Sequence, residues 1–255
     1  METVFESYLV IRTSAGAFRG INTGCSEGIT GTATTASSSF TDATSSLSFD
    51  LTQVLTPVWN GTTRLGSLLT QTYSIHNPTG SAIAFDIARY FDADIQYQVH
   101  LNDGGGRMFV NGLELLFETD AATGTATSPV GVAITGEGGT IPATGRYQVD
   151  KFDDVGNSLF VSGALTDSVY QDGADVDQTV DAGMDYDVEL GLRNQFALGP
   201  GESTTYVTRT YFVSGDLPEP GSLSALCFGV AWLLVLRALR SDDRRSATRR
   251  RLPTR

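Results

Sequence analysis

The sequence predicts an all-β protein, in which an antiparallel β-sandwich at residues 1–213 is followed by one C-terminal transmembrane helix. Three observations support this prediction. Several segments alternate apolar and polar residues, turn sequences separate these segments, and an apolar run precedes a cluster of arginines at the end of the chain. With 255 residues the chain has room for one large all-β domain or two small ones, and we expect one.

Alternation is clearest in residues 69–76, where every second side chain is apolar, as in a half-buried strand. Residues 3–11 also resemble a strand, and apolar residues share one face in 83–87. A single strand from 83 to 101 would be about 60 Å long, so we expect a bend at residues 92–94. Further strands are expected at residues 147–152, 159–161, 186–192 and 204–213.

Turn sequences stand between these segments. Residues 77–80 form an Asn-Pro-Thr-Gly turn, 103–106 a glycine-rich turn, and 198–203 a turn before the last strand. The Asn-Gly pair within residues 110–113 predicts a two-residue hairpin. Two segments rich in Thr, Ala, Ser or Gly fit either a long exposed strand or a loop, namely residues 31–46 and 121–145.

Charge is divided unevenly along the chain. The formal net charge is -12, but the last nineteen residues hold eight arginines and two aspartates, which is +6, and the remainder therefore carries -18. An acidic body argues against binding to nucleic acid, which requires a basic face. A basic tail beside an apolar run instead indicates a membrane.

The apolar run covers residues 221–236 without a charge, and extension to 239 gives a length of about 28 Å. We therefore expect a linker at 214–220, a transmembrane helix at 221–239 and an arginine-rich cytoplasmic tail at 240–255. The positive-inside rule places the body outside the cytoplasm. The arginines that flank the helix are Arg237, Arg240, Arg244 and Arg245.

The order of Pro218-Glu219-Pro220, a short apolar helix and an arginine cluster resembles the PEP-CTERM sorting signal. This resemblance covers about the last forty residues. It implies a Gram-negative bacterium that makes exopolysaccharide, and processing by a membrane-embedded exosortase. The tail is longer than usual for this signal, and Asp242 and Asp243 interrupt it. The LPxTG signal of sortases has the same order, but Pro220 stands where that signal needs threonine.

Export also requires a leader, yet residues 1–20 contain no basic segment followed by a long apolar one. We therefore expect the true start to lie upstream of Met1. The predicted location is an inner-membrane precursor that later reaches the cell surface or the extracellular matrix.

Residues that could carry chemistry are few. His76 and His100 fall on polar strand faces, where surface histidines are the simpler interpretation and a zinc site has little support. Cys25 has an acidic neighbour, and Cys227 lies in the apolar run, so we expect neither a reactive thiol nor an internal disulfide. Asp92 and Asp94 are either solvated turn residues or a carboxylate pair for a glycosidase or a cation.

The densest acidic cluster includes Asp172, Asp175 and Asp177, and it is either a solvated loop or a weak calcium site. No other cofactor is expected. We expect a non-enzymatic structural or binding protein whose partners are the membrane, an exosortase-like enzyme and exopolysaccharide. The alternative is a secreted carbohydrate-active enzyme that uses an acidic pair. Exposed strand aromatics would favour sugar binding, and facing carboxylates about 5 to 9 Å apart would favour hydrolysis.

Overall fold

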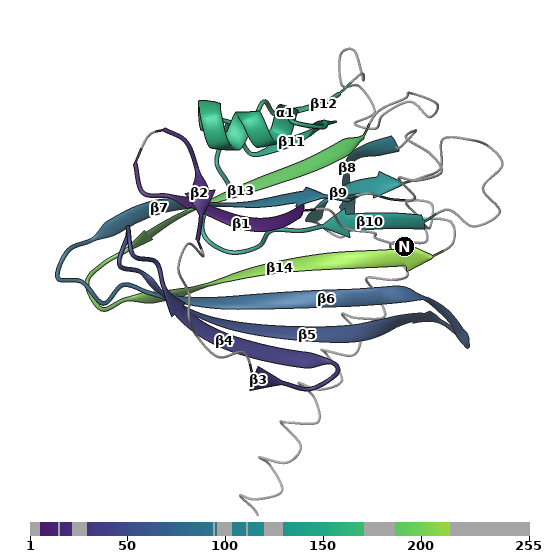
Figure 1. Cartoon of the computed structure of the whole chain (residues 1–255), viewed down its shortest axis with the longest axis horizontal. Coiled ribbons are helices and arrows are strands. Elements are labelled where there is room, and N and C mark those ends of the chain that lie inside the picture. Colours follow the sequence, from purple (N-terminus) through teal and green to yellow (C-terminus); the bar gives the residue numbers. More distant parts are fainter. Residues whose placement is uncertain are drawn as a thin grey trace, which may run out of the picture. The chain divides into compact units, whose positions relative to one another are not determined.

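The computed structural model describes residues 6–14, 16–21, 30–93, 95, 104–110, 112–119, 130–170 and 187–214. Two sheets make up most of this part. The six-stranded sheet has the order β12-β11-β13-β7-β1-β2, and the eight-stranded sheet has the order β3-β4-β5-β6-β14-β10-β9-β8. Figure 1 shows β14, β6, β5 and β4 side by side in the second of these. The strands β11 and β12 pair in parallel, whereas the others with a defined register pair antiparallel. The prediction of an all-β, mostly antiparallel fold is confirmed.

The bounds of the elements follow. The six-stranded sheet contains β1 (Glu6–Arg12), β2 (Arg19–Gly20), β7 (Ile83–Asp92), β11 (Tyr147–Lys151), β12 (Ser168–Val169) and β13 (Val188–Leu198). The eight-stranded sheet contains β3 (Thr30–Gly31), β4 (Thr35–Thr41), β5 (Ser48–Asn60), β6 (Thr63–His76), β8 (Gly104–Val110), β9 (Leu113–Thr119), β10 (Val130–Ile134) and β14 (Ser203–Ser214). Two short helices lie between β11 and β12, namely α1 (Asp154–Asn157) and the π-helix η1 (Ser158–Ser162).

The two sheets face each other across shared apolar clusters. In one cluster Leu190 and Leu192 of β13 pack with Val132 and Ile134 of β10. A second cluster joins residues of β1, β7 and β13 to residues of β4, β5, β6 and β14. The opposite face of the six-stranded sheet has its own cluster, in which Val10, Ala88 and Tyr90 pack with Val155, Leu159 and other residues of the α1–η1 segment. Strands β1, β7 and β13 are therefore buried on both faces over part of their length.

Several sequence predictions agree with the observed elements. The alternating residues 69–76 lie in β6, residues 204–213 lie in β14, and the turn at 77–80 follows β6 directly. The turn is tied to the fold by Asn77, whose side-chain amide donates hydrogen bonds of 2.8 to 3.1 Å to three backbone carbonyls. The hairpin between β8 and β9 has Gly112 at φ 80°, as the Asn-Gly signal requires.

Two of the predicted elements are wrong. Residues 159–161 were expected to be a strand but belong to η1, because Leu159 is buried in the cluster under the helices and Gly163, at φ 71°, ends the segment. The prediction of a glycine-rich turn at residues 103–106 is also wrong, because Gly104, Gly105 and Gly106 are the first three residues of β8. A Cβ on Gly105 would lie 2.8 Å from a Val188 methyl, so the missing side chain serves close packing between the sheets.

Among the described residues, no helix is long and apolar enough to cross a membrane. The predicted transmembrane helix at 221–239, the tail at 240–255 and all but the first residue of the linker at 214–220 lie outside the described residues.

Candidate functional site

A groove of about 480 Å³ lies on the face of the six-stranded sheet that points away from the eight-stranded sheet. The strand register builds it, because Arg12 of β1 lies opposite Asp86 of β7, and Asp86 lies opposite Gln195 of β13. These three side chains therefore form one row across neighbouring strands. The lining consists of Arg12, Thr13, Ser14, Ala84, Phe85, Asp86, Gln195 and Phe196.

Arg12 is fixed at one side of the groove. Its Nε and Nη2 lie 2.7 and 2.6 Å from Oδ2 of Asp86, and its Nη1 donates to the carbonyls of Gly16 and Gly163. The guanidinium also stands 4.6 Å from the centre of the Phe18 ring. Each of the three nitrogens is engaged, so Arg12 orients Asp86 and anchors the end of η1.

The groove is backed by aromatic packing from the core. The rings of Phe85 and Phe196 are stacked with centroids 5.2 Å apart and an interplanar angle of 11°. Phe196 in turn makes an edge contact with Tyr206 of β14. These contacts link the strands that carry Asp86 and Gln195 to the opposite sheet, which holds the walls of the groove in place.

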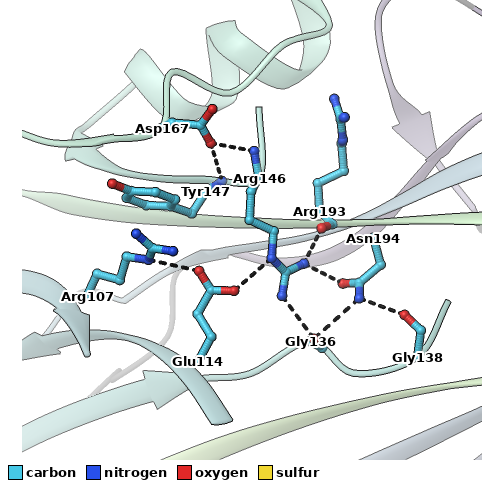
Figure 2. Close-up of polar contacts among 9 residues, drawn as sticks. All are labelled: Arg107, Glu114, Gly136, Gly138, Arg146, Tyr147, Asp167, Arg193 and Asn194. Carbon is cyan, nitrogen blue, oxygen red and sulfur yellow. Dashed lines mark hydrogen bonds and ion pairs between the residues drawn. The ribbon is translucent and has the colours of Figure 1, made fainter. Parts of the chain in front are cut away.

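A second polar cluster is centred on Arg146, just before β11 (Figure 2). Its Nε donates a 2.7 Å bond to Glu114, and Nη1 donates to the backbone carbonyl of Arg193 and to Oδ1 of Asn194. Nη2 donates to the carbonyl of Gly136 at 3.2 Å. Arg146 is 5% exposed and Glu114 7%, so this is a buried ion pair with its hydrogen bonds satisfied.

Arg107 completes this cluster from β8. It donates a 2.8 Å bond to the second oxygen of Glu114 and lies 3.8 Å from the centre of the Tyr147 ring. Asp167 accepts hydrogen bonds from the backbone amides of Gly145, Arg146 and Tyr147. Figure 2 shows these residues tying β8, β9, β11 and β13 to the loop at 135–146. We interpret the cluster as a structural clamp, because its charged atoms contact one another and backbone groups.

Another buried carboxylate, Glu189 of β13, contacts the start of α1. It accepts bonds of 3.0, 2.9 and 3.0 Å from the backbone amides of Asp153, Val155 and Gly156, and one from the hydroxyl of Tyr90. Burial raises the pKa of Glu189, and the four hydrogen bonds offset this only in part. Burial also raises the pKa of Tyr90, with a further contribution from its bond to Glu189.

The structure describes two of the histidine and aspartate candidates from the sequence, His76 and Asp92. His76 is half-buried at the end of β6, and its Nδ1 lies 3.0 Å from the hydroxyl oxygen of Ser203. Asp92 is 1% exposed at the end of β7, so its interpretation as a solvated turn residue is wrong. Its position opposite Glu189 places it on the side of the sheet covered by the helices. His100 and Asp94 lie outside the described residues.

The remaining candidates also lie outside the described residues. These are Cys25, Cys227, the calcium candidates Asp172, Asp175 and Asp177, the sorting motif Pro218-Glu219-Pro220, and the flanking Arg237, Arg240, Arg244 and Arg245. Within the described ranges, no group of three or more His, Cys, Asp or Glu side chains is placed to hold a metal ion.

The groove was not predicted from the sequence. More than seventy residues separate Arg12 from Asp86, and more than seventy separate Asp86 from Gln195. The sequence does contain one indication of the groove, because a charged residue, Asp86, interrupts the apolar segment 83–87. The structure also exposes aromatic side chains on strands, namely Tyr8, Trp59 and Phe109. Comparison with known proteins yields no matching family model and no matching curated protein.

Proposed function

We propose that this chain is an exported, non-enzymatic protein of the cell surface or extracellular matrix, with a β-sandwich body that has a structural or binding role. The sorting half of this proposal rests on the ordered signal of Pro218-Glu219-Pro220, the apolar run at 221–236 and the arginine cluster. This order is consistent with an anchored precursor that an exosortase-like enzyme processes outside the cytoplasm.

The groove is the observation that supports a role without catalysis. Hydrolysis of a glycoside ordinarily requires two carboxyl groups about 5 to 9.5 Å apart on either side of the bond. Among the described residues that line the groove, Asp86 is the one carboxylate, and Arg12 binds it through two nitrogens. The described lining of the groove has the polar groups to bind a ligand and contains no second acid of the kind that hydrolysis needs.

The alternative is a carbohydrate-active enzyme that uses Asp92 and Asp94. A catalytic carboxyl group must reach its substrate, and the 1% exposure of Asp92 argues against that use. Exposed aromatic residues on strands, such as Tyr8 and Trp59, are more in keeping with binding to a sugar surface.

The proposal can be tested with the full chain in detergent, assayed against a panel of glycans and esters. We expect no turnover above that of the buffer. Asp86→Asn and Asp92→Asn are the matched variants, because each removes one carboxylate and nearly preserves side-chain size. Turnover by the wild-type chain that either substitution abolishes would show an enzyme and contradict this part of the proposal.

A further inference from the structure

We propose that the groove between β1, β7 and β13 binds a neutral sugar unit through Asp86, Gln195, Thr13 and Ser14. This inference deepens the proposed function and rests on it for the biological source of the sugar. The groove carries hydrogen-bonding groups that have no partner in the described part of the chain.

Asp86 presents one free oxygen. Both bonds from Arg12 go to Oδ2, and Oδ1 accepts no hydrogen bond from the described part of the chain. The side chain is 13% exposed, so Oδ1 is held beside the groove in a fixed orientation. A carboxylate oxygen fixed by an arginine is a strong acceptor for a hydroxyl group.

Gln195 lies directly across from Asp86 in the neighbouring strand. Its backbone amide and carbonyl are both bonded to Thr140, but its side-chain amide has no hydrogen-bond partner within the described ranges. The hydroxyl groups of Thr13 and Ser14 are exposed at the opposite wall and are likewise unpaired there. The groove therefore offers one pure acceptor and three groups that both donate and accept.

This set matches a polyhydroxylated ligand. Each sugar hydroxyl donates one hydrogen bond and accepts others, so vicinal hydroxyls can be satisfied by a neighbouring carboxylate and amide. Arg12 and Asp86 balance each other in charge within the described lining, and each nitrogen of Arg12 is already engaged, which leaves one N–H of Nη2 for a ligand. The acidic body, at -18 without the tail, also disfavours a uronic acid. A neutral sugar is therefore the best electrostatic match.

Size and shape agree with this assignment. A volume of about 480 Å³ falls in the usual range for small-ligand sites, which is about 300 to 1,000 Å³. Ala84 has a small side chain and so fills little of the groove. The stacked rings of Phe85 and Phe196 lie beneath the groove in the core. The site can therefore bind one unit of a longer chain that continues across the surface.

Calorimetry on the full chain in detergent tests the inference. The probes are neutral trisaccharides of glucose, galactose and mannose, with a trisaccharide of glucuronic acid as the charged comparison. We expect saturable binding of at least one neutral probe and weaker binding of the charged one. Gln195→Ala should weaken binding about two- to tenfold, the usual effect of one neutral hydrogen bond. Thr13→Val should act in the same direction, because it keeps the shape and removes the hydroxyl.

The controls separate the groove from other surfaces. Gln53→Ala makes the same change on the eight-stranded sheet, so it should leave the affinity unchanged. Thermal melts verify that each variant is folded. The inference is overturned if no neutral probe binds, if the charged probe binds best, or if Gln53→Ala weakens binding while Gln195→Ala does not. Correct processing of the tail in the same protein would leave the proposed function standing in each of these cases.

Discussion

The hydroxyl of Tyr90 on β7 donates a 2.6 Å hydrogen bond to Oε1 of Glu189 on β13. The same carboxylate binds three backbone amides at the start of α1, so one side chain joins the sheet to the helical segment above it. This segment also carries Gly163, whose carbonyl contacts Arg12 at the groove. The stability of the helical segment and the geometry of the groove are therefore connected.

The first prediction concerns the pH dependence of this contact. Because burial raises the pKa of Glu189 above its ordinary 4.5, the folded state binds the proton more tightly than the unfolded state. The free energy of unfolding contributed by Glu189 should fall as the pH rises from 4.5 through the folded pKa. Glu189→Gln removes this titration.

Urea unfolding of the wild-type chain and of Glu189→Gln across this pH range measures the effect. The stability of the wild type relative to the variant should decrease with rising pH. Tyr90→Phe is a useful control, because it removes one hydrogen bond to Glu189 and keeps the titrating group. A relative stability that increases with pH would mean that the four hydrogen bonds outweigh burial.

The second prediction concerns the clamp in Figure 2. Glu114→Ala leaves the buried Arg146 without its carboxylate and should destabilise the fold by about 3 to 5 kcal/mol. Adding Arg146→Met should recover part of this loss, because it removes the unpaired charge. Lys151→Ala, which breaks an exposed ion pair with Asp154, should cost less than about 1 kcal/mol.

Chemical denaturation of the two single variants and the double variant gives the coupling energy. If the losses from Glu114→Ala and Arg146→Met simply add, the two residues do not act as a pair and the clamp interpretation fails.

The sequence predicted the strands better than the site, for a physical reason. Alternation is a local property, so residues 69–76 and 204–213 were located correctly. The run at 159–161 was too short to distinguish a strand from a buried helical turn. The strand expected at 186–192 continues to Leu198 because Arg193 and Asn194 are buried by partners distant in sequence.

The long hairpin of β5 and β6 was also missed, although Asn60-Gly61 at its tip is the same turn signal as at 110–113. The groove could not be found in this way. Its polar side chains meet only through the registers of β1 with β7 and of β7 with β13, and pairing between strands distant in sequence is not encoded in any one segment.

The third prediction concerns calcium. If the acidic cluster with Asp172, Asp175 and Asp177 binds the ion, a hundredfold excess over Kd should stabilise the fold by about 2.7 kcal/mol. Thermal melts in calcium and in EDTA measure this shift. Replacing the three aspartates with asparagine should remove it, and identical midpoints for the wild-type chain in the two solutions would rule the site out.

The central claim is that the C-terminal segment is a sorting signal which is removed. The run at 221–236 should insert with Arg237 and the later arginines in the cytoplasm, since each buried arginine costs about 2.5 to 3.5 kcal/mol on insertion scales. In this orientation we expect Pro218-Glu219-Pro220 at the outer interface, where its prolines would disfavour a helix and leave it accessible to a membrane-embedded protease or transpeptidase.

Mass spectrometry of the mature protein tests this claim most directly. The chain should be expressed with a working signal peptide in a host that has an exosortase. If the signal is removed, we expect a mature C-terminus near residue 220, and a membrane-bound precursor when Pro218, Glu219 and Pro220 are all replaced by alanine. Recovery of intact Arg255 from the mature wild-type protein would instead show a permanent anchor and contradict the account.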